Sequence, residues 1–256
     1  KKIKLMLKYK NLLVSGCSFT FNKGWAEHIR DQYNINLINL AGSGAGNTHI
    51  ANSIITQCEL NKFKVGPSNT YVIVMWSGPD RLDTMIDVKH IDYEGSPDQY
   101  EYSPHSAWLS TGGSSGMGNN PTVADVVLRP AYPYKDAHTQ ALECYVTICT
   151  TWHYLRSRGF KFKFLNYRNL KIGARDTAFD WLALMPEHLE ADSMFMNCMT
   201  PYEYALRENK LAQDDYHPTE QGFVEWCDKY LIPEIHDDLI DQWRLSCGRG
   251  RMCEYI

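Results

Sequence analysis

The sequence predicts an α/β fold in which a parallel β-sheet lies between two layers of helices. Continuous apolar runs rich in β-branched residues, such as YVIVMW at 71–76, are typical of strands that are buried on both faces of a sheet. Segments with apolar residues at helical spacing alternate with these runs. The resulting order, β-α-β-α-β-insertion-α-β-insertion-α, favours a three-layer α/β/α architecture, and 256 residues are enough for one large domain.

The first half of the chain is expected to supply three strands and two helices. The first helix is indicated by Trp25, Ile29 and Tyr33, which follow each other at four-residue spacing. The glycine-rich segment AGSGAGN then separates the second strand from the second helix. The five elements are strands at 11–16, 34–41 and 71–76, and helices at 25–33 and from 48 to about 61.

The second half is expected to supply one more strand, further helices and two loop-rich insertions in a single domain spanning 1–256. Residues 79–135, rich in Gly, Pro, Ser and Asp, form the first insertion, and the Met-rich, helical residues 174–208 form the second. Gly159 is expected to cap a long helix, and Pro218 fits the first turn of the last helix. The remaining elements are a helix at about 136–158 and a strand at 160–167.

The composition indicates a folded protein without a nucleic-acid partner. Seven Trp, 16 Tyr and 9 Phe argue against disorder, because disordered chains are poor in aromatic residues. The formal net charge of −4, from 26 basic and 30 acidic residues, comes without a long basic block. The electrostatic footprint of a nucleic-acid-binding protein is therefore missing from the sequence.

The amino-terminal residues predict neither a secretory signal nor a membrane anchor. In KKIKLMLKYK, lysines interrupt the short apolar stretch, whereas a signal peptide needs an uninterrupted apolar region and a small-residue cleavage site. No apolar run approaches the ~20 residues that a membrane-spanning helix needs. We expect no membrane partner and a cytoplasmic rather than a secreted protein; no feature indicates an oligomeric state.

The eight cysteines are scattered and include no CxxC pair. Zinc sites usually have closely paired ligands, so the sequence predicts no bound metal. In a chain of this length we expect free, partly buried thiols in a reducing compartment. A bond between Cys247 and Cys253 is the alternative for an exported protein.

Polar residues with the chemistry of a nucleophilic site follow several of the predicted strands. Ser18 follows the first strand, Gly44 and Asn47 follow the second, and Ser77 to Arg81 follow the third. The carboxyl ends of strands in an open parallel sheet share one edge, where functional residues gather. A further segment, DDYHP at 214–218, precedes the last helix. A serine hydroxyl needs a base such as histidine, and a carboxylate that orients the imidazole.

Three segments resemble the conserved blocks of the SGNH/GDSL hydrolase superfamily. They are GCS at 16–18, NLAGSGAGN at 39–47, and the D-x-x-H within DDYHP at 214–218. Cys17 stands where Asp is common in that family. The resemblance covers most of the chain through its four core strands and leaves both insertions unmatched. It implies a flavodoxin-like α/β/α fold and the hydrolysis of esters without a metal or other cofactor.

The resemblance also implies a role for each matching residue. Ser18 would be the nucleophile, His217 the general base and then the general acid, and Asp214 the residue that orients the imidazole. The backbone N–H groups of Ser18 and Gly44 would form the oxyanion hole. Cys17 itself is the alternative nucleophile, although a small buried residue beneath the sheet is the simpler interpretation.

The chain departs from the family after the third strand. The family supplies an asparagine there in a G-x-N-D pattern, and the best alignment places Pro79 at that position. Proline has no hydrogen-bond donor, so a third oxyanion contact would have to come from Asn47, Ser77 or Arg81. Asn47 is our preferred donor, because it lies in the adjacent loop and carries an amide.

The expected substrate is a small-molecule or glycan ester, most plausibly an acetyl or other acyl ester of a carbohydrate. Aromatic residues in the first insertion suit one wall of a substrate cleft. Ser77, Arg81 and His49 are candidate substrate contacts. The alternative for Arg81 is a structural salt bridge, and the alternative for His49 is a solvated residue at a helix start. The spacing G-x-G-x-G in AGSGAGN disfavours a dinucleotide-binding loop.

A different class of function also fits the sequence. The missing asparagine is compatible with a catalytically degenerate SGNH-fold protein that binds a glycan or a protein partner through the same cleft. GCSFT and the W-S-x-x-x-R third block also look like segments of proteins encoded by viruses of bacteria, which makes a virion component conceivable.

Overall fold

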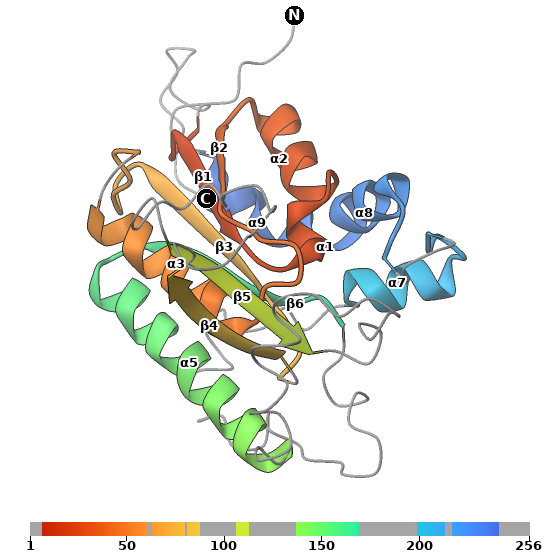
Figure 1. The fold of residues 1–256 in the computed structure, drawn as a ribbon. Coiled ribbons are helices and arrows are strands. Elements are labelled where there is room, and N and C mark those ends of the chain that lie inside the picture. The colour runs from red at the N-terminus through yellow and green to blue at the C-terminus, as the bar shows by residue number, and fades with distance from the viewer. Residues whose placement is uncertain are drawn as a thin grey trace, which may run out of the picture.

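The centre of the fold is a four-stranded parallel sheet with the strand order β2-β1-β3-β6 (Figure 1). The computed structural model describes residues 7–60, 63–79, 81–87, 106–112, 137–168, 199–212 and 217–240. The strands are β1 (Asn11–Ser15), β2 (Asn36–Asn39), β3 (Thr70–Trp76) and β6 (Lys161–Asn166). The four predicted strands are confirmed, although β2 is shorter than the predicted 34–41.

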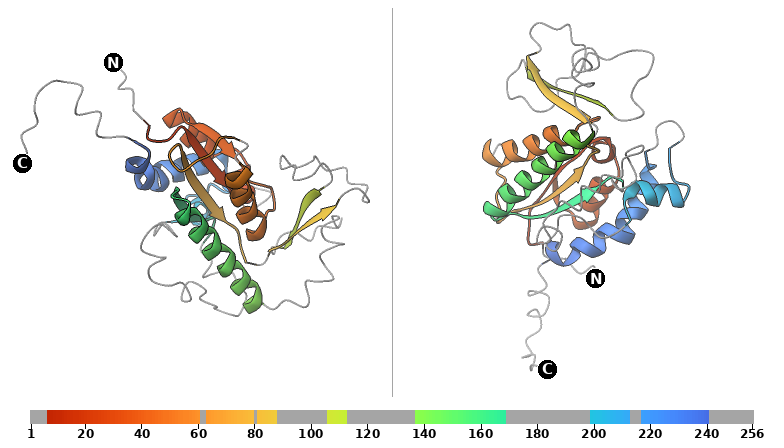
Figure 2. Two further views of the ribbon diagram at one scale, coloured as in Figure 1. Left: turned by 90° about the vertical axis from the view of Figure 1, so that its left-hand side faces the viewer. Right: turned by 90° about the horizontal axis from the view of Figure 1, so that it is seen from below.

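Helices cover both faces of the sheet and complete the predicted three layers (Figure 2). One face carries α3 (Asn47–Leu60) and α5 (Ala137–Ser157), which pack against each other. The other face carries α2 (Trp25–Tyr33), α8 (Glu220–Trp226), the π-helical turn η5 (Cys227–Leu231) and α9 (Ile232–Leu239). Two further short helices are α1 (Ser18–Phe21) and α7 (Pro201–Arg207).

Burial between these layers explains the apolar runs in the sequence. Every residue of β3 is buried, as are Leu12, Leu13 and Val14 of β1. β2, at the edge of the sheet, buries one of its four residues, Ile38. The central strands consist of continuous apolar runs because their side chains are buried on both faces of the sheet.

The strand order creates a switch point between β1 and β3, where the direction of strand succession reverses. Loops leaving the carboxyl ends of these two strands diverge to opposite faces, and ligands of open α/β sheets bind in the crevice that forms there. Ser18 follows β1 and Ser77 follows β3. The fold thus brings two of the sequence-predicted segments to one edge.

The first insertion contains an antiparallel hairpin of β4 (Arg81–Asp87) and β5 (Ser106–Gly112). It is separate from the main sheet and contacts α3 through β4 (Figure 2). In the second insertion, residues 201–207 are helical as predicted, whereas 174–198 lie outside the described residues. Asp80, Cys198, Cys247 and Cys253 also lie outside them.

The last helix, whose start was predicted near Pro218, begins two residues later, at Glu220. Pro218 forms a β-bridge with Leu211, and Thr219 adopts an extended conformation and accepts a hydrogen bond from the Gly222 N–H at 3.1 Å. The threonine cap and the bridge together delay the helix until Glu220. The cap at Gly159 is confirmed, with φ at +75° in the left-handed region that favours glycine.

No helix in the described ranges is long and apolar enough to cross a membrane. The five cysteines described, Cys17, Cys58, Cys144, Cys149 and Cys227, are free thiols.

Candidate active site

Ser18 stands at a tight turn between β1 and α1. The carbonyl oxygen of Cys17 accepts hydrogen bonds from the N–H groups of Thr20 and Phe21, both at 2.9 Å. Gly16 is required by space, because a Cβ atom there would clash with the Thr20 side chain. Cys17 is fully buried, as expected for a packing residue. The turn therefore directs Cys17 inward and places Ser18 at the carboxyl edge of the sheet.

His217 is held by a short pairing of two chain segments between α7 and α8. The His217 carbonyl accepts the Ala212 N–H at 2.7 Å, and the Thr219 N–H donates to the Lys210 carbonyl at 2.8 Å. The bridge between Leu211 and Pro218 lies between these bonds. This pairing, which we call the histidine hairpin (210–212 with 217–219), fixes the backbone on which the imidazole stands.

The histidine hairpin brings His217 to Ser18 across 199 residues of sequence. Oγ of Ser18 and Nε2 of His217 lie 2.6 Å apart, which is hydrogen-bonding distance. Ser18 is only 7% exposed, and His217 is half-buried. A hydroxyl beside an imidazole nitrogen in such a place can transfer its proton as it attacks an electrophile. The Asp214 carboxylate, predicted to orient the imidazole, lies outside the described residues.

Aromatic residues that the sequence did not single out support this pair. The Phe19 ring lies 4.7 Å from the imidazole of His217 and 4.7 Å from the ring of Tyr167, which follows β6. Phe223 of α8 packs edge-on against Phe19 at 5.9 Å. In the sequence they appear only as a large apolar residue directly after Ser18 and another at the end of a predicted strand.

The glycine-rich segment after β2 forms a turn beside the Ser18 loop. The Ala45 N–H donates to the Gly42 carbonyl at 3.1 Å, and Gly44 has φ at +78°, the geometry that the third residue of a type II turn requires. The Gly42 N–H donates to the Gly16 carbonyl at 3.1 Å, which connects this turn to the turn that carries Ser18. Among the hydrogen bonds of the described residues, none is donated by the N–H of Ser18 or of Gly44.

Asn47 and Ser77 contact each other at the carboxyl end of β3. The Asn47 amide donates to the Ser77 carbonyl at 3.0 Å and to Sγ of Cys144 at 2.9 Å, and its oxygen accepts the Ser77 N–H at 2.8 Å. Asn47, expected to donate to an oxyanion, is thus bonded to α5 and to the end of β3. Ser77 is fully buried, and its hydroxyl has no hydrogen-bond partner within the described part of the chain.

The other two candidate substrate contacts, Arg81 and His49, lie against the glycine turn. Nη1 of Arg81 donates to the Ala45 carbonyl at 3.3 Å. His49 is 4% exposed, so the interpretation as a solvated helix-start residue is wrong. Its ring packs against Gly42, where a Cβ atom would come within 2.9 Å of Cε1. The His49 ring is therefore buried against the glycine turn and is not solvated.

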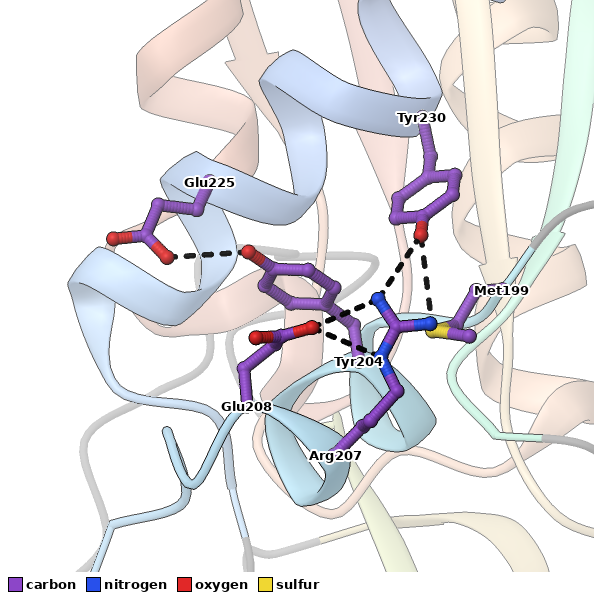
Figure 3. Close-up of polar contacts among 6 residues, drawn as sticks. All are labelled: Met199, Tyr204, Arg207, Glu208, Glu225 and Tyr230. Carbon is purple, nitrogen blue, oxygen red and sulfur yellow. Dashed lines mark hydrogen bonds and ion pairs between the residues drawn. The ribbon is translucent and has the colours of Figure 1, made fainter.

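A polar cluster joins α7 to α8 and η5 at the base of the histidine hairpin (Figure 3). The Tyr204 hydroxyl donates to Glu225 at 3.2 Å, and Arg207 donates to the Tyr230 hydroxyl at 3.3 Å. Lys210, at the start of the hairpin, donates to the other Glu225 oxygen at 2.9 Å. The Lys210 hydrogen bond, with that from Gln221, holds the pKa of Glu225 below its ordinary value. An ion pair between Glu225 and Lys210, which we call the charged tie, therefore links α8 to the start of the histidine hairpin.

No protein-family model matches the chain, and no curated protein is a significant match. Similar solved structures include esterases and a GDSL-like lipase. An acetylxylan esterase mutant from Geobacillus stearothermophilus is 13% identical, with a TM-score of 0.49 over 88% of this chain and 94% of that one. The GDSL-like lipase, from Bacteroides thetaiotaomicron, is 12% identical, with a TM-score of 0.48 over 90% and 89%. The psychrotrophic esterase EstA from Pseudoalteromonas sp. is 12% identical, with a TM-score of 0.47 over 89% and 97%.

Proposed function

We propose that this protein is a divergent serine hydrolase of the SGNH type that cleaves an ester, with Ser18 as its nucleophile. The observation that carries the proposal is the 2.6 Å separation of Ser18 Oγ and His217 Nε2. A serine hydroxyl is a weak nucleophile until a base within hydrogen-bond reach removes its proton. The position of the pair beyond the switch point of the sheet supports the same conclusion.

In the proposed reaction, Oγ of Ser18 forms a bond to the ester carbonyl carbon while its proton passes to Nε2 of His217. The carbonyl electron pair moves onto the oxygen and then returns, which breaks the bond to the alcohol. The departing alcohol oxygen takes the proton from Nε2. A water molecule repeats these steps on the acyl-enzyme, releases the acid and restores the serine. His217 carries every proton in this cycle, so the proposal requires no metal or cofactor.

The negative charge on the carbonyl oxygen needs hydrogen-bond donors. We assign this role to the backbone N–H groups of Ser18 and Gly44, which have no partner among the described residues. Loss of one such donor typically costs ~2.7–4 kcal/mol of transition-state stabilisation. Asn47 was our preferred third donor, but its existing bonds to Ser77 and Cys144 favour a supporting role.

We propose that Asp214 orients the imidazole through Nδ1, three residues before His217 along the chain. An oriented imidazole keeps its unprotonated nitrogen toward the serine. For the substrate we propose a small-molecule or carbohydrate ester. The burial of Ser77 and His49 argues for structural roles, which leaves Arg81 as the partly exposed candidate beside the turn.

Reaction with a fluorophosphonate probe and hydrolysis of p-nitrophenyl acetate test this proposal. We expect the wild-type protein to do both and Ser18→Ala to do neither. Ser157→Ala, which removes an exposed hydroxyl at the end of α5, is the matched control and should retain both activities. A folded wild-type protein that is inert in both assays would overturn the hydrolase. The degenerate alternative, a protein that binds a glycan or protein partner, would then be tested by a glycan-binding array.

A further inference from the structure

Two residues of β4 hold opposite sides of one peptide group in the glycine turn. Nη1 of Arg81 donates to the carbonyl oxygen of Ala45 at 3.3 Å, and Oδ1 of Asp83 accepts the N–H of Gly46 at 2.9 Å. The carbonyl of Ala45 and the N–H of Gly46 belong to the same planar peptide unit. Arg81 and Asp83 can act together because residues two apart on a strand project from the same face.

Asp83 also reaches the first turn of α3. Its second oxygen, Oδ2, accepts the N–H of His49 at 3.0 Å. Close approach of the carboxylate depends on Gly46, where a Cβ atom would lie 2.5 Å from Oδ2 and 2.8 Å from Cγ. The glycine at this position therefore has a specific function: it leaves room for the carboxylate of a residue 37 positions later.

Gly44 lies between this peptide and a second anchor. On its amino-terminal side, the Gly42 N–H is bound to the Gly16 carbonyl in the nucleophile's turn. On its carboxyl-terminal side, the peptide unit between Ala45 and Gly46 is held by Arg81 and Asp83 of β4. With both ends of a four-residue turn fixed, the direction of the Gly44 N–H has little freedom.

We propose that Asp83 and Arg81 are positioning residues that hold the glycine turn so that the Gly44 N–H points at the substrate carbonyl oxygen. This inference rests on the proposed hydrolase and deepens it. The competing explanation is that Asp83 is only an N-terminal cap of α3. A cap contributes to stability alone, whereas a positioning residue contributes to the turnover number.

The two explanations differ in steady-state kinetics with p-nitrophenyl acetate. We expect Asp83→Ala to lower kcat on the order of 100-fold with little change in KM, because a shift of about 1 Å at a catalytic group has an effect of that size. Asp83→Asn should lower kcat by a smaller factor, since its amide oxygen still accepts one N–H. Arg81→Met should act in the same direction as Asp83→Ala.

Ser53→Ala is the matched control for a weakened α3. The Ser53 hydroxyl bonds the Ile50 carbonyl and Ser15 Oγ at 2.8 Å each, away from the glycine turn. This variant should lower Tm and leave kcat near that of the wild type. If Asp83→Ala likewise lowers Tm and leaves kcat unchanged, the positioning role is overturned and Asp83 is a cap.

A double-mutant cycle gives an independent test. Gly46→Ala should lower kcat in the wild-type background, because the new methyl group displaces the Asp83 carboxylate, and should add little loss in the Asp83→Ala background. Equal effects in the two backgrounds would contradict the proposal. If the wild type proves inert, the proposed hydrolase fails, and the backbone amide resonance of Gly44 still tests the inference. An unchanged Gly44 resonance in Asp83→Ala would overturn it.

Discussion

The ring of Phe19 lies 4.7 Å from the imidazole of His217, so the residue that follows Ser18 packs directly against the proposed base. Because the Phe19 ring packs against the imidazole, it limits the rotation of that ring. Phe19 is 5% exposed and contacts Tyr167 and Phe223 on its other sides. One side chain thus contacts the end of β6 at Tyr167, Phe223 of α8 and His217.

Phe19→Ala should impair both folding and activity. Truncation of a buried phenylalanine typically costs about 3–5 kcal/mol of stability through lost burial and the cavity left behind. The imidazole would also lose the surface that orients it, so kcat should fall in the protein that remains folded. Urea denaturation and p-nitrophenyl acetate hydrolysis measure the two effects. Phe19→Leu, which refills most of the volume, should recover most of the stability; equal losses for both substitutions would contradict the packing argument.

Gly16→Ala should destabilise the turn that carries Ser18. The added Cβ would lie 2.8 Å from Cβ of Thr20 and 3.1 Å from the Met75 carbonyl oxygen, and neither neighbour is a flexible chain end. Overpacking of this kind typically costs about 1–3 kcal/mol, which thermal denaturation would detect. Gly66→Ala is the control, because its Cβ would meet one atom, Oδ1 of Asn69, at an ordinary 3.8 Å. A loss at Gly66 as large as that at Gly16 would show that steric crowding is not the cause.

The strands and the pair Ser18 and His217 could be named from the sequence because their signals are local. An apolar run that breaks into Gly-Cys-Ser, and a D-x-x-H before a helix, are both visible within a few residues. The contacts of Asp83 are not visible in this way. They depend on β4 passing beside the amino terminus of α3, and neither a strand nor a carboxylate contact was predicted within residues 79–135.

Three residues depart from their local preferences because of contacts that the sequence pattern does not show. Pro218 has a good angle for a helix start, yet its bridge with Leu211 and the cap at Thr219 move the start to Glu220. His49 is a polar residue at a helix start, yet the glycine turn lies over its ring. Asn47 carries a suitable amide, yet the end of β3 and the thiol of Cys144 take its hydrogen bonds.

Asn47→Ala should reduce stability, because it leaves the buried N–H and C=O of Ser77 without their partner. Each unsatisfied buried group costs about 1–3 kcal/mol. Asn47→Asp should be worse, since it would bring a carboxylate against the Ser77 carbonyl oxygen. Chemical denaturation measures both effects. If Asn47→Ala instead keeps wild-type stability and lowers only kcat, the amide acts on the oxyanion and the supporting role is wrong.

The charged tie between Glu225 and Lys210 predicts a loss of stability in acid. Hydrogen bonds from Lys210 and Gln221 hold the pKa of Glu225 below its ordinary value, about 4.3. A group whose pKa is lowered by folding stabilises the folded state above its unfolded pKa, and this contribution disappears as the pH falls through the folded pKa. The Tm of the wild type should therefore exceed that of Glu225→Gln near neutral pH. The difference should shrink as the pH falls below the ordinary pKa of a glutamate and disappear below the lowered pKa of Glu225. In the Lys210→Met background the difference between Glu and Gln should shrink at every pH, because the strongest partner is gone. A Tm difference that persists unchanged into acid would assign the effect of Glu225→Gln to packing. It would contradict the claim that the ion pair between Glu225 and Lys210 stabilises the histidine hairpin.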